Sequence, residues 1–156
     1  MVNILFVCLG NICRSPMAEA VMRDLVKKEG LEEAIQIDSA GTGNWHTGKQ
    51  PHEGTRRILE HHNISYEGQK ARQLTKEDLS QYDYLIGMDN ENIGNIRRLA
   101  GYHSTGKIQR LLDYVEESDI LDVPDPYYTG NFDEVFEMVH KSCRNLLNEV
   151  KTLHKL

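Results

Sequence analysis

Short apolar runs alternate with longer amphipathic stretches along the chain. The runs have the length and the β-branched and aromatic content of strands, and they cover residues 2–9, 34–40, 82–88 and 108–112. Helical spacing or helix-start signals lie between and after them, at residues 15–29, 51–62, 76–79, 90–99 and 132–150. Strands that alternate with helices predict an α/β fold, in which a parallel sheet carries helices on both faces.

The first and the last helix carry the clearest signals. Ser15 is a good N-cap residue and Pro16 suits the first helical position, so we expect the first helix to open there. Gly30 is expected to end it. Apolar residues recur with helical period from residue 132 to residue 150, which predicts a long helix with Cys143 on its buried face.

Length, charge and cysteine content limit the classes of protein to which this chain can belong. The 156 residues suit one domain, expected over residues 1–156. The formal charge of −6 argues against a nucleic-acid binder, which would show a basic face. Apolar runs stay below membrane-spanning length, and no basic lead precedes the first one. Three cysteines cannot all pair within the chain, so we expect reduced thiols in the cytoplasm.

The stretch CLGNICRS at residues 8–15 stands where the first predicted strand meets the first helix. Ligands of parallel sheets bind beyond the carboxyl ends of the strands, so this junction is the leading candidate for a site. Gly10 and Asn11 tolerate positive φ, which lets a short loop curl until its N–H groups converge on an anion. Arg14 adds a fork that grips two oxygens of a tetrahedral oxyanion.

Cys8 lies at the base of this curl, with five residues between it and Arg14. The positive potential of the loop and of the helix start favours its thiolate, and Ser15 can donate a hydrogen bond to the sulfur. A thiolate aimed at a bound oxyanion suits phosphoryl transfer through a covalent intermediate. The alternative is a buried cysteine in a tight turn beside a surface arginine. The strand before the loop and the helix after it favour the catalytic interpretation.

Cys13 allows two interpretations. It fills the core as a spare thiol, or its sulfur reaches Cys8 across the curled loop and forms a reversible disulfide. Such a disulfide would protect the thiolate from irreversible oxidation.

Phosphoryl transfer to a cysteine also needs an acid for the leaving group. Asp125 stands between two prolines in VPDPYYTG, residues 123–130, and their fixed φ angles would position it. Tyr127 and Tyr128 would supply aromatic walls. The alternative is a surface turn, which Asp-Pro and Tyr-Tyr-Thr-Gly also suit.

No metal and no organic cofactor is expected. His52 and Glu53 begin like a zinc-binding helix, but Arg56 occupies the place of the second histidine.

The stretch CLGNICRSPMAEA at residues 8–20, followed by DPYY at residues 125–128, resembles the low-molecular-weight protein tyrosine phosphatase family. The segments IDSAGT, ARQLTKEDL and DYLIGMD are similar to family segments in the same order, so the resemblance covers nearly the whole chain. It implies a single domain with a four-stranded parallel sheet and a metal-independent cytoplasmic phosphatase. The expected partner is a phosphotyrosyl protein, without nucleic acid or membrane, and the expected assembly is a monomer or weak oligomer.

The resemblance also implies a role for each site residue. Cys8 is the nucleophile, Arg14 binds the phosphate, and Asp125 protonates the leaving phenolate and then acts as base for the hydrolytic water. Asn11 holds the shape of the loop, Ser15 supports the thiolate and Ser39 supports Asn11. The N–H cradle comprises Leu9, Gly10, Asn11, Ile12, Cys13 and Arg14, and the substrate rim comprises Ile12, Trp45, Asp89, Tyr127 and Tyr128.

One departure from the family pattern lies behind the loop. Many members carry a histidine there, hydrogen-bonded into the supporting network, whereas this chain has Gly68 and Gln69.

Three other functions share parts of this pattern. Arsenate reductases need two further cysteines downstream, and no cysteine lies between Cys13 and Cys143. Protein-arginine phosphatases tend to carry a small polar residue at the position of Ile12, so Ile12 favours phosphotyrosine. A phosphate-binding redox sensor without turnover would use the same cradle, but Asp125 counts against it, because binding alone needs no acid.

Overall fold

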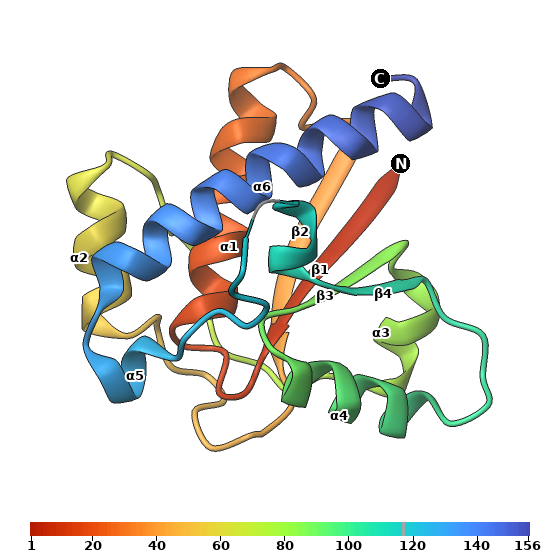
Figure 1. The fold of residues 1–156 in the computed structure, drawn as a ribbon, viewed down its shortest axis with the longest axis horizontal. Helices are drawn as coiled ribbons and strands as arrows, with labels where there is room; N and C mark the ends of the chain where they lie inside the picture. Colours follow the sequence, from red (N-terminus) through yellow and green to blue (C-terminus); the bar gives the residue numbers. More distant parts are fainter. Residues whose placement is uncertain (117) are drawn as a thin grey trace.

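Four parallel strands form the centre of the molecule, in the order β2-β1-β3-β4 (Figure 1). They are β1 (Val2–Cys8), β2 (Ile35–Gly41), β3 (Tyr84–Gly87) and β4 (Lys107–Arg110). The computed structural model describes residues 1–116 and 118–156. The predicted α/β fold, with a four-stranded parallel sheet and helices on both faces, is confirmed.

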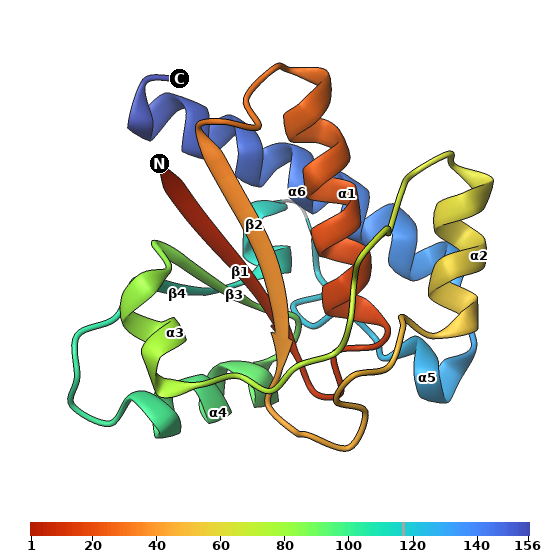
Figure 2. The same ribbon diagram turned by 180° about the vertical axis from the view of Figure 1, so that it is seen from behind.

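Each face of the sheet is covered by a different pair of helices (Figures 1 and 2). Helices α1 (Arg14–Lys28) and α6 (Phe132–His154) cover one face, with α2 (Glu53–His61) beside them. Helices α3 (Lys76–Gln81) and α4 (Asn90–Ala100) cover the other.

Strand β1 supplies apolar side chains to both layers, because neighbouring residues of a strand face opposite sides. Ile4 and Phe6 pack toward α1 and α6, whereas Leu5 and Val7 pack toward α3 and α4. All four are 0% exposed. Burial of one such side chain contributes about 1.5–3 kcal/mol, so β1 is held firmly, and with it the position of the loop at its carboxyl end.

Helix α1 begins at Arg14, so the prediction that Ser15 caps it is wrong. The left-handed φ of 57° at Asn11 turns the chain early enough for Cys13 to become the N-cap. Cys13 makes no side-chain capping hydrogen bond. The first-turn amides of α1 are therefore left to whatever binds in the loop. Ser15, freed from capping, turns its hydroxyl toward Cys8.

Other boundaries differ by a few residues. Helix α2 begins at Glu53 rather than at residue 51, because the ring of His52 accepts from the Gly54 amide and acts as the N-cap. Strand β4 ends at Arg110, and the expected strand residues 111–112 belong to the 3-10 helix η1 (Leu111–Tyr114). Residues 126–129, where no helix was expected, form the short helix α5 (Pro126–Thr129). The predicted burial of Cys143 in α6 is confirmed.

The carboxyl ends of the strands lie near one another around the lower centre of Figure 1. The loop after β1, the segment after β2, the start of α4 and helix α5 gather there. Within the described residues, no helix has the length and apolar character needed to cross a bilayer.

Candidate active site

The loop between β1 and α1 is held by its carbonyl groups. The carbonyls of Cys8 and Leu9 accept from the amides of Thr42 and Gly43, each at 2.9 Å. Further along, the Ile12 carbonyl accepts from the His52 amide at 2.6 Å. In a trans peptide the N–H points opposite to the carbonyl, so these outward carbonyls turn the amides that follow them toward the inside of the curl. The result is a concave ring of amides, the arrangement that the sequence analysis expects to bind an anion.

Gly41 is needed where β2 ends behind the loop. A Cβ at Gly41 would lie 2.8 Å from the Leu9 carbonyl oxygen, closer than a Cβ approaches backbone atoms. Only glycine therefore lets β2 pass this close to the loop.

The sulfur of Cys8 receives two polar contacts at the base of the loop. Its Sγ lies 2.9 Å from the Ser15 hydroxyl oxygen and 3.3 Å from the Asn11 amide nitrogen. Ser15 Oγ already accepts from Asn11 Nδ2 at 2.8 Å. The proton of the Ser15 hydroxyl is therefore free to donate to the Cys8 sulfur.

The orientation of the Asn11 side chain follows from its other partners. Its Oδ1 accepts from the Arg72 amide at 2.9 Å, so Nδ2 faces the two serines and also donates to Ser39 Oγ at 3.0 Å. Ser39 in turn donates to Glu19 Oε1 at 2.6 Å. Two branches of hydrogen bonds thus diverge from the Asn11 amide, one through Ser39 to the buried carboxylate of Glu19 and one through Ser15 to the Cys8 sulfur.

Glu19 belongs to the hydrogen-bond network behind the loop, and the sequence analysis missed it. It is 3% exposed, and burial raises its pKa, although the Ser39 hydroxyl and Arg23, at 2.7 Å, favour the charged form. The signal was present: an acid stands inside the apolar stretch MAEAV, four residues after Ser15. Gln69 lies nearby, where the family histidine is missing, and donates to the Pro16 carbonyl at 3.0 Å.

Arg14 is buried and held along one side of its guanidinium. Its Nη1 donates to Asp89 Oδ2 at 2.6 Å and to the Val123 carbonyl at 3.0 Å. Its Nε is buried and has no hydrogen-bond partner among the described residues. Its Nη2 makes one long contact of 3.5 Å, to Asp125 Oδ2. The edge formed by Nε and Nη2 is therefore the part of the fork that faces two oxygens of a bound oxyanion.

Asp89 was expected on the substrate rim, but the structure places it beside Arg14. One carboxylate oxygen accepts from Arg14, and the other accepts from the Asn92 amide at 2.8 Å and caps α4. Both oxygens are engaged, and Asp89 is absent from the residues that line the mouth. The D-x-x-N pattern of a helix start was the sequence signal for this position.

Asp125 reaches the loop from a distant part of the sequence. Its Oδ2 lies 3.5 Å from Arg14 Nη2, and its Oδ1 accepts from the Tyr127 amide at 3.1 Å. The carboxyl is thus the N-cap of α5, and 23% of its side chain remains exposed. An acid that is held by the backbone and still open to the pocket has the position that proton donation needs.

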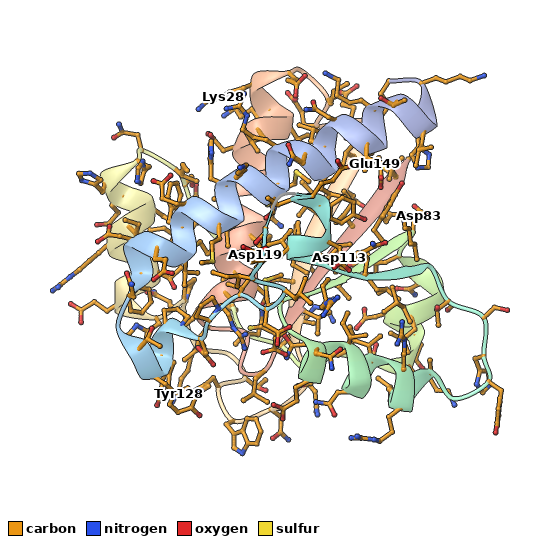
Figure 3. The ribbon with its side chains drawn as sticks, viewed as in Figure 1. Lys28, Asp83, Asp113, Asp119, Tyr128 and Glu149 are labelled. Atoms are coloured by element: carbon orange, nitrogen blue, oxygen red, sulfur yellow. The ribbon has the colours of Figure 1, made fainter. Side chains whose placement is uncertain are left out.

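A pocket of about 250 Å³ opens above the loop. Its wall includes Ile12, Trp45, Asp125 and Tyr127, with Tyr128 at the outer edge. Figure 3 shows Tyr128 at the lower edge beside α5, far from Asp83 near the amino ends of the strands. The structure thus brings four of the five expected rim residues together.

His46 is a second wall residue that the sequence analysis did not select. Its ring lines the pocket and packs on the loop. The approach is close, since a Cβ at Gly10 would lie 3.0 Å from the His46 ring.

Cys13 faces away from solvent and is 3% exposed. Burial, with the nearby Cys8, raises the pKa of its thiol to about 12, so it stays protonated at neutral pH. Cys8 and Cys13 are both free thiols in this structure. Across residues 1–116 and 118–156, no three His, Cys, Asp or Glu side chains are grouped to hold a metal ion.

The model of the family described as low molecular weight phosphotyrosine protein phosphatase matches residues 3–155. The chain belongs to this family. It is 58% identical over 151 residues to the low molecular weight protein-tyrosine-phosphatase YfkJ of Bacillus subtilis, with 97% of each chain covered. Identity to the protein-tyrosine-phosphatase PtpA of Staphylococcus aureus is 45% over 152 residues, which covers 96% of this chain and 94% of that one.

Solved structures of low-molecular-weight phosphatases share the fold. The crystal structure of YfkJ matches with a TM-score of 0.95 at 57% identity, covering 97% of this chain and 96% of that one. The crystal structure of a Drosophila arginine phosphatase matches with a TM-score of 0.89 at 32% identity, covering 97% and 98%. Proteins named for different phosphorylated residues therefore have this fold, and the choice between substrates depends on the pocket.

Proposed function

We propose that this protein hydrolyses phosphotyrosine in protein substrates through a cysteinyl-phosphate intermediate on Cys8. One observation supports this proposal above the others. Asp125 is remote in sequence from the loop, yet its Oδ2 lies 3.5 Å from Nη2 of Arg14. The Cys8 sulfur lies at the base of the same loop. A nucleophile, an oxyanion fork and a proton donor then converge on one pocket, which is the set of groups that phosphoryl transfer requires.

The first step transfers the phosphoryl group to sulfur. The Cys8 thiolate attacks phosphorus while the free edge of Arg14 and the inward amides of the loop bind the phosphate oxygens. The bond from phosphorus to the phenolic oxygen breaks, and Asp125 gives its proton to that oxygen. Ser15 stabilises the thiolate before attack and after the phosphate has left.

The second step returns the enzyme to its starting state. Asp125, now a carboxylate, takes a proton from a water molecule that attacks the cysteinyl phosphate. The sulfur–phosphorus bond breaks, inorganic phosphate leaves, and Asp125 is protonated again for the next cycle. The hydrogen bond from Asn11 to Ser15 favours sulfur as the leaving group, because it leaves the Ser15 proton for the thiolate that forms.

The pocket favours an aryl phosphate over the alternatives. Trp45 and Tyr127 are 67% and 51% exposed, so they offer flat apolar surfaces at the mouth. Ile12 adds an aliphatic wall next to the phosphate, which offers a guanidinium substrate no hydrogen-bond partner on that side of the pocket. Phosphoarginine is the second candidate substrate, because the Drosophila arginine phosphatase has the same fold.

The test compares kcat/KM for matched phosphotyrosyl, phosphoarginyl and phosphoseryl peptides, with reductant and EDTA present. Preference for phosphotyrosine supports the proposal. Preference for phosphoarginine keeps the chemistry and overturns the substrate assignment. Phosphate binding without turnover of any peptide would indicate a binding module, and Cys8→Ser is the control for contaminating activity.

We also propose that Cys8 and Cys13 form a protective disulfide under oxidation. Peroxide converts the Cys8 thiolate to a sulfenic acid, and the Cys13 thiol then condenses with it and releases water. Wild-type activity lost to peroxide should return with dithiothreitol, whereas a Cys13→Ser variant should lose activity permanently; equal recovery would contradict the disulfide. The odd number of cysteines suits a reducing compartment, and we assign the protein to the cytoplasm.

A further inference from the structure

A second groove lies on the other side of Trp45 from the pocket above the loop. It measures about 550 Å³, and Leu9 and Trp45 line both hollows. Leu74 and Leu99 add apolar surface, and Glu91 and Arg98 of α4 line it with their charged side chains. We call this hollow the α4 groove. None of the roles proposed for catalysis uses it.

We propose that the α4 groove binds the polypeptide that flanks the phosphotyrosine of a substrate, with Arg98 recognising an acidic side chain. This inference rests on the proposed function, because it extends the substrate site of that reaction. A phosphotyrosine bound in the pocket would leave its own backbone at the mouth, next to Trp45. Trp45, with 67% of its surface exposed, is then a divider over which the chain passes into the groove.

The side chains on the groove-facing side of α4 are spaced so that they can contact an extended polypeptide. Glu91, Asn95 and Arg98 stand at i, i+4 and i+7, so they share one side of the helix. Seven residues of helix span about 10 Å, which matches about three residues of an extended peptide. The carboxylate of Glu91 stands at the start of α4, where the mouth opens, and Arg98 stands in the last turn.

The charges determine what the groove can recognise. Arg98 donates to Asn95 Oδ1 at 2.8 Å and makes no ion pair with a carboxylate of the described residues. Its cation is therefore available to an acidic side chain. On the side of the pocket away from the α4 groove, α5 leads into the first turn of α6. This turn carries Asp133 and Glu134. An acidic flanking segment would be repelled there and attracted toward Arg98.

The experiment measures kcat/KM for phosphotyrosyl peptides in which one glutamate is moved through successive positions on both sides of the phosphotyrosine. The wild-type protein should prefer glutamate at one position by about two- to fivefold, the usual effect of an exposed ion pair. Arg98→Glu should abolish this preference and create one for lysine at the same position. Arg97→Glu is the matched control, because Arg97 carries the same charge in the same helical turn but does not line the groove.

A small aryl phosphate, 4-nitrophenyl phosphate, separates this inference from the proposed function. Its kcat/KM should be the same in the wild type, Arg98→Glu and Arg97→Glu, because it does not reach the groove. Equal effects of the two arginine substitutions on the peptides, or a glutamate preference that survives Arg98→Glu, would overturn the inference. Failure of the wild-type protein to turn over any aryl phosphate would instead overturn the proposed function.

Discussion

Replacement of Asp89 by asparagine tests how Arg14 is held. The two oxygens of Asp89 have different partners, Arg14 Nη1 at 2.6 Å and the Asn92 amide at 2.8 Å. Asparagine has one acceptor oxygen, so it can cap α4 or receive Arg14 but cannot do both. If its oxygen caps the helix, its NH₂ group faces the Nη1 donors of Arg14.

The expected loss follows from the burial of this pair. Arg14 is 3% exposed and Asp89 is 21% exposed, so solvent screens their attraction only in part. A hydrogen bond between charged groups contributes about 1.5–3 kcal/mol, and the Val123 carbonyl still holds Nη1 in the variant. We therefore expect a loss of about 2 kcal/mol in transition-state stabilisation, which is roughly a 30-fold fall in kcat/KM.

The assay is steady-state hydrolysis of 4-nitrophenyl phosphate, with inhibition by inorganic phosphate measured in parallel. Asp122→Asn is the matched control, because Asp122 also accepts from an amide at the start of α4, that of Asn90 at 2.9 Å, and does not contact Arg14. Asp89→Asn should lower kcat/KM and weaken phosphate inhibition, and Asp122→Asn should change neither by more than about twofold. Tighter phosphate binding in Asp89→Asn would show that Asp89 competes for Arg14 instead of positioning it, and would refute the reasoning.

Two further predictions concern the proton donor and the support behind the loop. Asp125→Asn should lower kcat/KM for phenyl phosphate by about 10²–10⁴-fold and that for 2,4-dinitrophenyl phosphate far less, because only the poor leaving group needs a proton; equal losses would exclude Asp125 as the acid. Asp78→Asn should lower the free energy of unfolding at neutral pH by about 1–2 kcal/mol, because Asp78 binds Arg72 at 2.9 Å. Burial alone would raise the pKa of Asp78, but hydrogen bonds from Arg72 and Thr75 outweigh it and leave the pKa below the usual 3.8. The stabilisation is therefore complete above about pH 4 and is lost as the pH falls through the lower folded-state pKa, so denaturant unfolding should show the two proteins converging in acid; a difference that persists there would contradict the ionic origin.

The sequence predicted the parts of the site that are local. The loop after β1 could be recognised because its nucleophile, its glycine and its arginine lie within one strand-to-helix junction, where geometry follows from a few neighbouring residues. The N-cap of α1 was misplaced by two residues, because the left-handed turn at Asn11 depends on the Arg72 amide, which comes from a distant segment. Helix α5 was missed because four residues carry no helical period.

The parts that sequence could not supply depend on long-range contacts. The residues around Asp125 do not indicate that its carboxyl approaches Arg14. The residues around Asp89 do not show whether it lies on the substrate rim or binds Arg14. Glu19 could have been noticed as an acid in an apolar stretch, but its partner Ser39 lies on a different strand. The flanking prolines indicated Asp125 as a candidate acid, and the resemblance to the family connected it with the loop.

The most direct test of the account is detection of the covalent intermediate. A phosphotyrosyl substrate is mixed with the protein, the reaction is quenched in acid within the first turnover, and peptides of the protein are analysed by mass spectrometry. We expect one phosphate on Cys8 in the wild type, and neither this adduct nor turnover in Cys8→Ser. Phosphate on another residue, or turnover by Cys8→Ser at the wild-type rate, would contradict it.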